Sequence, residues 1–400
     1  MKSSHRFSSS VPFESKTTAM SYHILLTGAT GLLGRYLLRN LLLADVPVAV
    51  VVRGIRRQSA EDRVEALMET WEDLLQREMP RPQVFEGDIC EPSLGLDAAA
   101  KHWIDKHCDL VLHNAASLSF IATSEDGEPF RSNVRGTENL LELCRETGIH
   151  DFHHVSTAYV CGLRRGRIME TELDVGQQLG NPYEESKVQA EKLIRSAEFL
   201  SPPTIYRPAI IVGDSKTGFT STFHGFYACL ELAHTLLNSK GVVGSNRVGE
   251  TKTRISLDGN ETKNFIPVDW VADVISHIVT HPRHHGQTYH LTPRQRVTTA
   301  MIRDVLEQAY GFKEAEFSGY GKPLDNPTDI EKLFYEHIRI YSSYWRDDPE
   351  FDTTNLDTAC PHLPCPTMDE ALLSMLSNKA MAMDFKWRDK PVKREKVHAS

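Results

Sequence analysis

The 400-residue chain contains no long apolar segment. Its best apolar run, residues 46–52, is seven residues long and includes Pro47, whereas a membrane-spanning helix needs roughly 18 or more apolar residues. No transmembrane segment is therefore predicted. The seven cysteines include no C-x-x-C pair, so zinc-binding and redox motifs are not indicated. We expect reduced thiols in a cytoplasmic protein.

The sequence also lacks internal repeats and an overall positive charge. Its formal net charge is −9, with 45 Lys and Arg against 54 Asp and Glu, so no long-range field attracts nucleic acid, and no nucleic-acid partner is predicted. Histidine is plentiful, but His153 and His154 are adjacent in a predicted strand and point to opposite faces. Residues 281–285 have the composition of a polar turn. No metal site is predicted.

The two ends of the chain have the composition of flexible segments. Residues 1–20 are rich in serine and contain no apolar stretch of signal-peptide length, so we predict a disordered extension, with Met20 as an alternative start. Residues 386–400 are rich in Lys and Arg and are predicted to be a flexible basic tail. The alternative is that this tail binds weakly to an anionic membrane surface.

Strand and helix patterns alternate along the first two hundred residues. The apolar run 22–27 precedes leucines at helical spacing, and 48–52 is the continuous run of a strand buried on both faces. This alternation predicts an α/β fold, a Rossmann-type doubly wound parallel sheet. We expect this domain at 21–292, with a lid insertion at about 214–262. A smaller mixed, mainly helical substrate lid is expected at 293–385.

A glycine motif lies between the first predicted strand and the first helix. Gly28, Gly31 and Gly34 are spaced three apart there. Glycines at such a turn let the backbone approach a pyrophosphate, which the helix N-terminus then binds. The motif predicts dinucleotide binding by Thr27, Gly28, Thr30, Gly31, Leu32, Leu33 and Gly34.

The residue after the second strand distinguishes the two nicotinamide dinucleotides. An acidic residue there binds the ribose of NAD, but this chain has Arg53, whose guanidinium suits a 2′-phosphate. We therefore predict NADP(H) rather than NAD, the alternative being that the arginine belongs to a solvated face. The ends of the third and fourth strands are expected to contact the same cofactor through Asp88, Ile89, Asn114, Ala115 and Ala116.

Tyr183 and Lys187 are four residues apart on a predicted helix, so their side chains share one face. An ammonium group beside a phenol lowers the phenol pKa. Bringing that pKa from about 10 to neutrality takes about 4 kcal/mol. Asn181 is a good N-cap and Pro182 suits the first helical position. The helix therefore holds Tyr183 in its first turn.

Thr157 is predicted at the carboxyl end of the fifth strand, where its hydroxyl can face a carbonyl group; Ser156 is the neighbouring candidate. Threonine is also a common strand residue, so this role depends on Tyr183 and Lys187. Together Thr157, Tyr183 and Lys187 form the predicted catalytic triad.

The aromatic residues of 334–345 either line an acyl-chain tunnel or form the core of the lid, and we favour the core.

These motifs resemble a known family. TGATGLLG, HNAA, NVRGT, VSTAYVCG, YEESK and RPAIIVGDSKTG follow one another as in the extended short-chain dehydrogenases/reductases. VVRG with Arg63 in the next helix, FIPVDWVAD and FDTTN are similar to the thioester-reductase and fatty acyl-CoA reductase branch, of the male sterility type. The resemblance covers residues 21–293 well.

The resemblance implies an NADPH-dependent reductase that converts an acyl thioester, on CoA or on an acyl carrier protein, to an aldehyde or alcohol. It implies catalytic roles for Thr157, Tyr183 and Lys187 and 2′-phosphate binding by Arg53. Further cofactor contacts are implied for Arg63, Asn133, Pro208, Ala209 and Ile210. The alternatives are an NAD(P)-dependent nucleotide-sugar epimerase or dehydratase and a dinucleotide-sensing regulator. A monomer or homodimer is expected.

Overall fold

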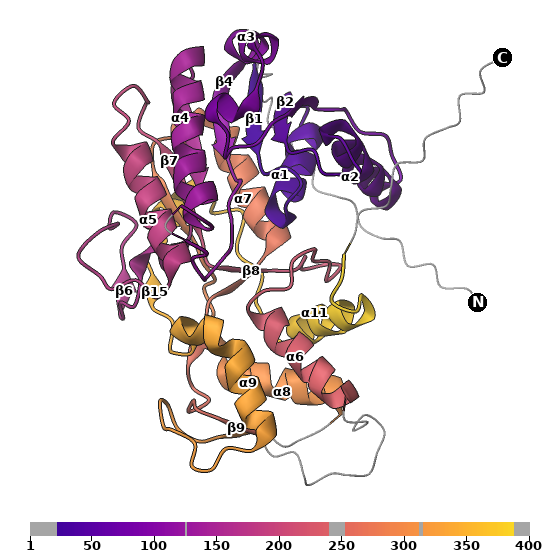
Figure 1. Cartoon of the computed structure of the whole chain (residues 1–400), viewed down its shortest axis with the longest axis vertical. Coiled ribbons are helices and arrows are strands. Elements are labelled where there is room, and N and C mark those ends of the chain that lie inside the picture. Colours follow the sequence, from indigo (N-terminus) through magenta and orange to yellow (C-terminus); the bar gives the residue numbers. More distant parts are fainter. Residues whose placement is uncertain (1–21, 125, 240–252, 312–314, 388–400) are drawn as a thin grey trace, which may run out of the picture.

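The computed structural model describes residues 22–124, 126–239, 253–311 and 315–387. Residues 1–20 and most of the predicted tail lie outside the described residues, as does the centre of the expected insertion. A seven-stranded sheet with strand order β12-β7-β5-β4-β1-β2-β3 dominates the described chain (Figure 1). All of its neighbouring strands pair in parallel. The strands are β1 (His23–Thr27), β2 (Val48–Val52), β3 (Gln83–Glu86), β4 (Cys108–His113), β5 (Asp151–Val155), β7 (Thr204–Pro208) and β12 (Thr288–Leu291).

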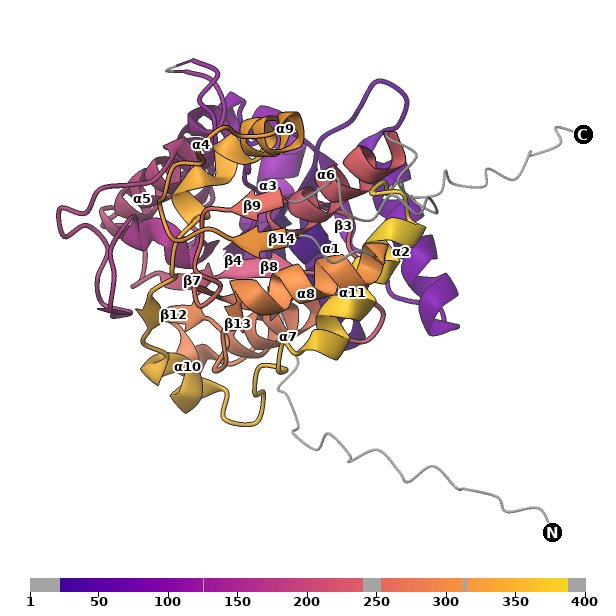
Figure 2. The same cartoon turned by 90° about the horizontal axis from the view of Figure 1, so that it is seen from below.

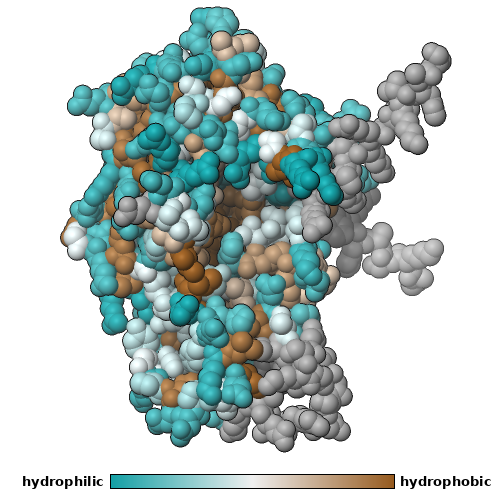
Figure 3. Space-filling model, viewed as in Figure 1, coloured by the Kyte–Doolittle hydropathy of each residue, from teal (hydrophilic) through white to brown (hydrophobic). Residues whose placement is uncertain are grey.

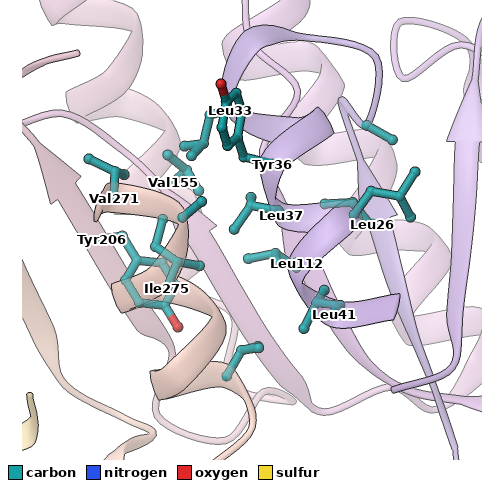
Figure 4. Packing of buried hydrophobic residues seen from close by; sticks show 14 of the residues in the cluster. Leu26, Leu33, Tyr36, Leu37, Leu41, Leu112, Val155, Tyr206, Val271 and Ile275 are labelled. Carbon is teal, nitrogen blue, oxygen red and sulfur yellow. The ribbon is translucent and has the colours of Figure 1, made fainter. Parts of the chain in front are cut away.

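The sheet is covered by helices on both faces, which confirms the predicted doubly wound fold. One face carries α1 (Leu32–Leu43), α2 (Ala60–Leu75) and α7 (Val268–Val279), and the other carries α3 (Ala98–His107), α4 (Gly136–Thr147) and α5 (Pro182–Arg195). Strand residues alternate between the two cores. Leu26 packs with α1 and α7, as in Figure 4, and Leu25 packs on the opposite side.

The topology places a crevice beside β1. Strands β2 and β4 are hydrogen-bonded to opposite sides of β1. The order in which successive strands are added to the sheet therefore changes direction at β1, and ligands of open α/β sheets bind at such a point. The turn η1 (Pro92–Gly95), the π-helical turn η2 (Arg131–Arg135) and the 3₁₀ turn η3 (Ala158–Cys161) lie in the connections. Helix α3 was not predicted; Asp97 begins it by accepting a hydrogen bond from the backbone N–H of Ala100.

A second, mainly helical part lies beyond the carboxyl edge of the sheet (Figures 1 and 2). Its helices α6, α8 and α11 share a separate hydrophobic cluster. The elements are β8 (Ile210–Val212), α6 (Phe226–Ser239), β9 (Thr253–Ile255), β10 (Thr262–Lys263), β11 (Phe265–Pro267), β13 (Val297–Thr298), α8 (Thr299–Tyr310), β14 (Ala315–Phe317), α9 (Asp329–Ile338), η5 (Arg339–Tyr344) and α11 (Glu370–Ala382). We call this part the lid. Among the described residues, no helix combines the length and apolar character that crossing a bilayer requires.

Part of the segment expected in the lid packs on the sheet domain instead. Strand β15 (Glu350–Phe351) pairs with β6 (Arg167–Ile168), and α10 (Thr354–Ala359) lies near β12. The buried Glu170 carboxylate accepts hydrogen bonds from the backbone N–H groups of His290 and Asn355. This contact joins residues 120 and 185 positions apart, so no local pattern indicates it.

Candidate active site

A cavity of about 690 Å³ lies at the carboxyl ends of β1, β2, β3, β4, β5 and β7 and continues into the lid. Figure 3 shows a recess with an apolar floor between the two parts of the molecule. The walls therefore come from both parts, with the glycine loop at one end and lid helices at the other.

The glycine loop forms a cradle for an anion. Gly28 has φ +73°, and a Cβ at this position would lie 2.7 Å from the backbone N of Ala115, so only glycine fits. Gly31 is the N-cap of α1, which has neither a side-chain cap nor an acidic residue in its first turn. Its N–H groups and positive dipole end face the cavity and fit the pyrophosphate of a dinucleotide.

The structure places most of the predicted cofactor residues in the cavity wall. Gly28, Thr30, Gly31, Leu32, Leu33, Arg53, Arg63, Asp88, Ile89, Asn114, Ala115, Ala116, Pro208, Ala209 and Ile210 all line it. The wall also includes Thr157, Tyr183 and Lys187. Residues from the ends of six strands thus meet in one crevice, as the parallel arrangement of the strands requires.

Three predicted cofactor residues lie behind the wall. The buried Thr27 Oγ1 is 2.8 Å from His113 Nδ1 and accepts hydrogen bonds from the N–H groups of Asn114 and Ala115. A Cβ at Gly34 would lie 1.9 Å from the carbonyl oxygen of Gly28, so this glycine lets α1 pack on the loop. Both residues shape the cradle instead of lining it.

Asn133 is the third residue behind the wall, in the π-helical turn before α4. Its amide nitrogen donates to Ser186 Oγ at 2.8 Å and to the Ser117 carbonyl at 3.0 Å, and its oxygen accepts from the Ser117 N–H. Asn133 therefore ties the loop after β4 to α5, next to Lys187. These hydrogen bonds fix α5, the helix that carries Tyr183 and Lys187, relative to that loop.

Two arginines lie at the dinucleotide end of the cavity. Arg63 donates from Nη1 to the carbonyl of Arg53 at 2.6 Å and from Nη2 to Thr30 Oγ1 at 3.0 Å. Arg53 Nη1 is 3.6 Å from Asp88 Oδ2, and the Arg53 side chain is 64% exposed. The Arg53 guanidinium thus lies at the exposed rim of the cavity.

The start of α5 has the predicted capping. Asn181 Oδ1 accepts from the N–H of Glu184 at 3.0 Å, and Glu184 Oε2 accepts from the N–H of Gly180 at 2.7 Å. Tyr183 is therefore held in the first turn of the helix. Thr157 lies two residues beyond the end of β5, where its hydroxyl accepts from the N–H of Tyr159.

Burial governs the protonation of the triad. It raises the pKa of Tyr183, and a hydrogen bond with Thr157 offsets only part of this rise, so the phenol is protonated at neutral pH. Burial lowers the pKa of Lys187 to about 7. Lys187 Nζ donates to the Val155 carbonyl at 2.8 Å and is 3.3 Å from His154 Nε2. The spacing of Tyr183 and Lys187 had predicted the opposite direction for the pKa of Tyr183, because an ammonium group beside the phenol would lower it.

Aromatic residues of the lid also line the cavity, although a role in the core of the lid was predicted for them. Phe334, Tyr341, Tyr344 and Trp345 form part of the wall. The ring of Phe120 lies edge-on to Tyr183, with centroids 5.7 Å apart, and to Tyr341 and Tyr344. Tyr335 differs, since its hydroxyl donates to the Arg254 carbonyl. The only sequence signal for this part of the wall is the spacing of the aromatic residues. The same spacing is equally consistent with a packed core.

The comparisons with known proteins agree with this geometry. Residues 26–275 match the sequence model of a family of NAD-binding domains described as male sterility protein. The chain belongs to this family. It therefore has an NAD(P)-binding reductase-type fold, which the cradle and the strand order independently support.

The chain is similar to parts of several longer proteins. It is 27% identical to the nonribosomal peptide synthetase asaC of Aspergillus flavus, over 83% of this chain and 33% of that protein. It is 29% identical to the L-2-aminoadipate reductase large subunit of Penicillium chrysogenum, over 72% of this chain and 20% of that protein. The chain thus spans a third or less of the length of these two relatives.

A solved structure with a similar fold is the terminal R domain from the myxalamid PKS-NRPS biosynthetic pathway. The TM-score is 0.73 at 27% identity, and the match covers 93% of this chain and 94% of that one. The similarity includes the lid as well as the sheet domain.

Proposed function

We propose that the protein is an NADPH-dependent reductase of an acyl thioester. The observation that carries the proposal is that the hydroxyls of Thr157 and Tyr183 lie in the wall of one cavity with the glycine cradle. The names of the relatives, an aminoadipate reductase and a terminal R domain among them, support the same activity.

The residues of the chain suggest how the reaction proceeds. The cradle of Gly28 and Gly31 would hold the reduced dinucleotide, which would supply the hydride. Tyr183 and Thr157 donate hydrogen bonds to the thioester carbonyl oxygen, where negative charge develops. The raised pKa of Tyr183 keeps the phenol protonated for this role. Lys187, with a pKa of about 7, exchanges protons at neutral pH and holds the cofactor ribose.

The overall reaction balances with one hydride and one proton. The carbonyl carbon gains the hydride, the carbon–sulfur bond breaks, and the sulfur leaves as a thiol after taking up the proton. The carbon product is an aldehyde. A second hydride and proton would convert the aldehyde to an alcohol.

The lid end of the cavity favours an apolar acyl group. Its wall is largely hydrocarbon, from Phe226, Ile302, Leu306, Phe317 and Phe334. A nucleotide sugar, the substrate class of the alternative, brings a diphosphate and several hydroxyls that this wall does not match. The thiol carrier is CoA or a carrier protein, and the same acyl site serves either.

Replacing Tyr183 tests the function. We expect Tyr183→Phe to lower thioester-dependent NADPH oxidation by about 10²–10⁴-fold, because the proton donor is lost. Its affinity for NADPH should not change, since the ring remains. The assay follows NADPH absorbance with short-, medium- and long-chain acyl-CoAs, and Tyr320→Phe, at an exposed position outside the cavity, is the control. Full activity in Tyr183→Phe, or nucleotide-sugar conversion without net NADPH use, would contradict the proposal.

We also propose that Arg53 selects NADPH over NADH. Losing one charge-assisted hydrogen bond to the 2′-phosphate costs about 1.5–3 kcal/mol, so Arg53→Ala should weaken NADPH binding by about 10–100-fold and leave NADH binding unchanged. Fluorescence titration with both dinucleotides measures this. Arg77→Ala, beyond the end of α2 and outside the cavity, is the matched control. An equal loss for both dinucleotides would show that Arg53 does not bind the 2′-phosphate.

A further inference from the structure

Asp151, His153 and His285 converge at the amino end of β5, at the sheet edge opposite the proposed active site. Asp151 and His153 lie on the same face of the strand because they are two residues apart. His285 comes from the loop between η4 (Pro282–His284) and β12. One ligand atom from each residue lies within 4.8 Å of the others. The fold brings them together across β7, which separates β5 from β12.

The hydrogen bonds of His285 leave a lone pair directed at a carboxylate. His285 Nε2 is 3.2 Å from the carbonyl oxygen of Val279, and a carbonyl can only accept, so Nε2 carries the hydrogen. In the neutral ring Nδ1 then has a lone pair, and it lies 2.8 Å from Asp151 Oδ2. Two lone pairs at this distance repel each other. A positive charge, from a second proton or from a metal ion, must compensate.

His153 presents a second nitrogen without a hydrogen-bond partner. Its side chain is fully buried, and Nε2 is 3.3 Å from Asp151 Oδ1 but outside hydrogen-bonding geometry, so it has no hydrogen bond within the described chain. The other nitrogen, Nδ1, is 2.8 Å from the hydroxyl of Tyr206. A buried imidazole nitrogen that has no hydrogen-bond partner and lies beside a carboxylate is available as a metal ligand.

We propose that Asp151, His153 and His285 bind a divalent transition metal ion, with Zn²⁺ as the preferred species. Two imidazole nitrogens and one carboxylate oxygen suit Zn²⁺ and disfavour Mg²⁺ and Ca²⁺, which prefer oxygen ligands. Tyr206 and the Val279 carbonyl orient the two rings from behind, as outer partners do in metal sites. The side chains of Asp151 and His285 are 30% and 12% exposed, which leaves access for the ion and for a fourth ligand from solvent.

The ion would act as a structural clamp. It would join β5 to the loop that leads into β12, the edge strand, across the intervening β7. The site is remote from the cavity, and none of its three ligands lines that wall. The proposal therefore stands independently of the proposed reductase activity.

A cobalt titration of the full chain tests the site. The protein is first stripped with a chelator, Co²⁺ is added, and the visible absorption of the bound ion is followed. We expect one tightly bound equivalent with a four-coordinate spectrum, displaced by Zn²⁺. His285→Gln and Asp151→Asn should each weaken binding by at least about 100-fold, since loss of an outer partner alone costs about 10–100-fold.

The control addresses a second group of histidines at the end of α7. The rings of His277, His281 and His362 lie close together there, so His281→Gln should leave the tight site unchanged. Circular dichroism verifies folding of each variant. Zn²⁺ should raise the melting temperature of the unmodified protein and of His281→Gln, but not that of His285→Gln or Asp151→Asn. Absence of saturable binding, unchanged binding in folded His285→Gln and Asp151→Asn, or loss of binding in His281→Gln would overturn the proposal.

Discussion

Lys187 shows how the proposed active site is built at the expense of stability. Its side chain is fully buried, with the Val155 carbonyl and His154 Nε2 as its direct hydrogen-bond partners. Burial also lowers the pKa of His154 well below its usual value, so that ring is a neutral acceptor. The ammonium group thus loses most of its hydration without gaining a directly bonded carboxylate.

Replacing this lysine should stabilise the protein. The pKa of Lys187 is about 7 in the folded chain and about 10.5 when unfolded, so between these values the unfolded chain binds more protons. Stability therefore rises with pH from about 7 to about 10.5. Lys187→Met should remove this dependence, raise the free energy of unfolding at pH 7 by on the order of 3 kcal/mol, and abolish reduction.

Urea unfolding at pH 7 and pH 9 measures both effects. Lys332→Met, at a side chain 62% exposed, is the control and should keep the pH dependence of the unmodified protein. A Lys187→Met variant that is no more stable at pH 7 would show that burial of the amine carries no such cost.

Asp348 connects three elements of the fold through one buried carboxylate. It accepts hydrogen bonds from Tyr159 in η3 at 2.7 Å and from the N–H of Asn264 at 3.0 Å, and it pairs with Lys263 Nζ at 3.0 Å. Only 2% of the residue is exposed. The segment after η5 is therefore attached both to η3, which follows Thr157, and to the base of the lid.

Removing this carboxylate should loosen the attachment. Asp348→Ala leaves a buried ammonium and a buried phenol without their partner, which typically costs about 3–5 kcal/mol. Asp357→Ala, which breaks an exposed pair with Arg294, should cost less than about 1 kcal/mol. The denaturation midpoints of the two variants compare them, and equal midpoints would contradict a central role for Asp348.

At the scale of the whole molecule, the sheet domain supplies the cradle and the triad, and the lid supplies the apolar wall. The cavity exists only where the two meet, so under the proposed function the acyl group and the reacting atoms would lie in different parts of the structure. The predicted cytoplasmic location and the monomer or homodimer state remain predictions.

The apolar wall predicts a dependence on acyl chain length. Each buried methylene contributes about 0.8 kcal/mol, so kcat/KM should rise about fourfold per methylene until the cavity is filled. Phe334→Ala, which removes a ring from the wall, should shift the optimum to longer chains. Leu333→Ala, on the same helix but exposed, should not. A series of acyl-CoAs measures the profile, and a profile independent of length would place the acyl group elsewhere.

The sequence by itself determined the features that depend on near neighbours. Gly28 and Gly34 are required by the turn that they form. Asn181 and Glu184 cap the helix that carries Tyr183. The apolar run 48–52 predicts a buried strand. Each of these depends on backbone geometry within a few residues. The rules for parallel connections then predict a doubly wound parallel sheet, whereas the order of its strands came from the structure.

Only the tertiary structure decided the features that depend on distant segments. It directed Lys187 toward His154, placed Phe334 and Trp345 against the cavity and brought His285 to Asp151. These contacts are set by side-chain packing between elements far apart in the chain. Burial and partner identity determine the pKa of a buried group, so the protonation of Tyr183 and Lys187 could not be read from their spacing.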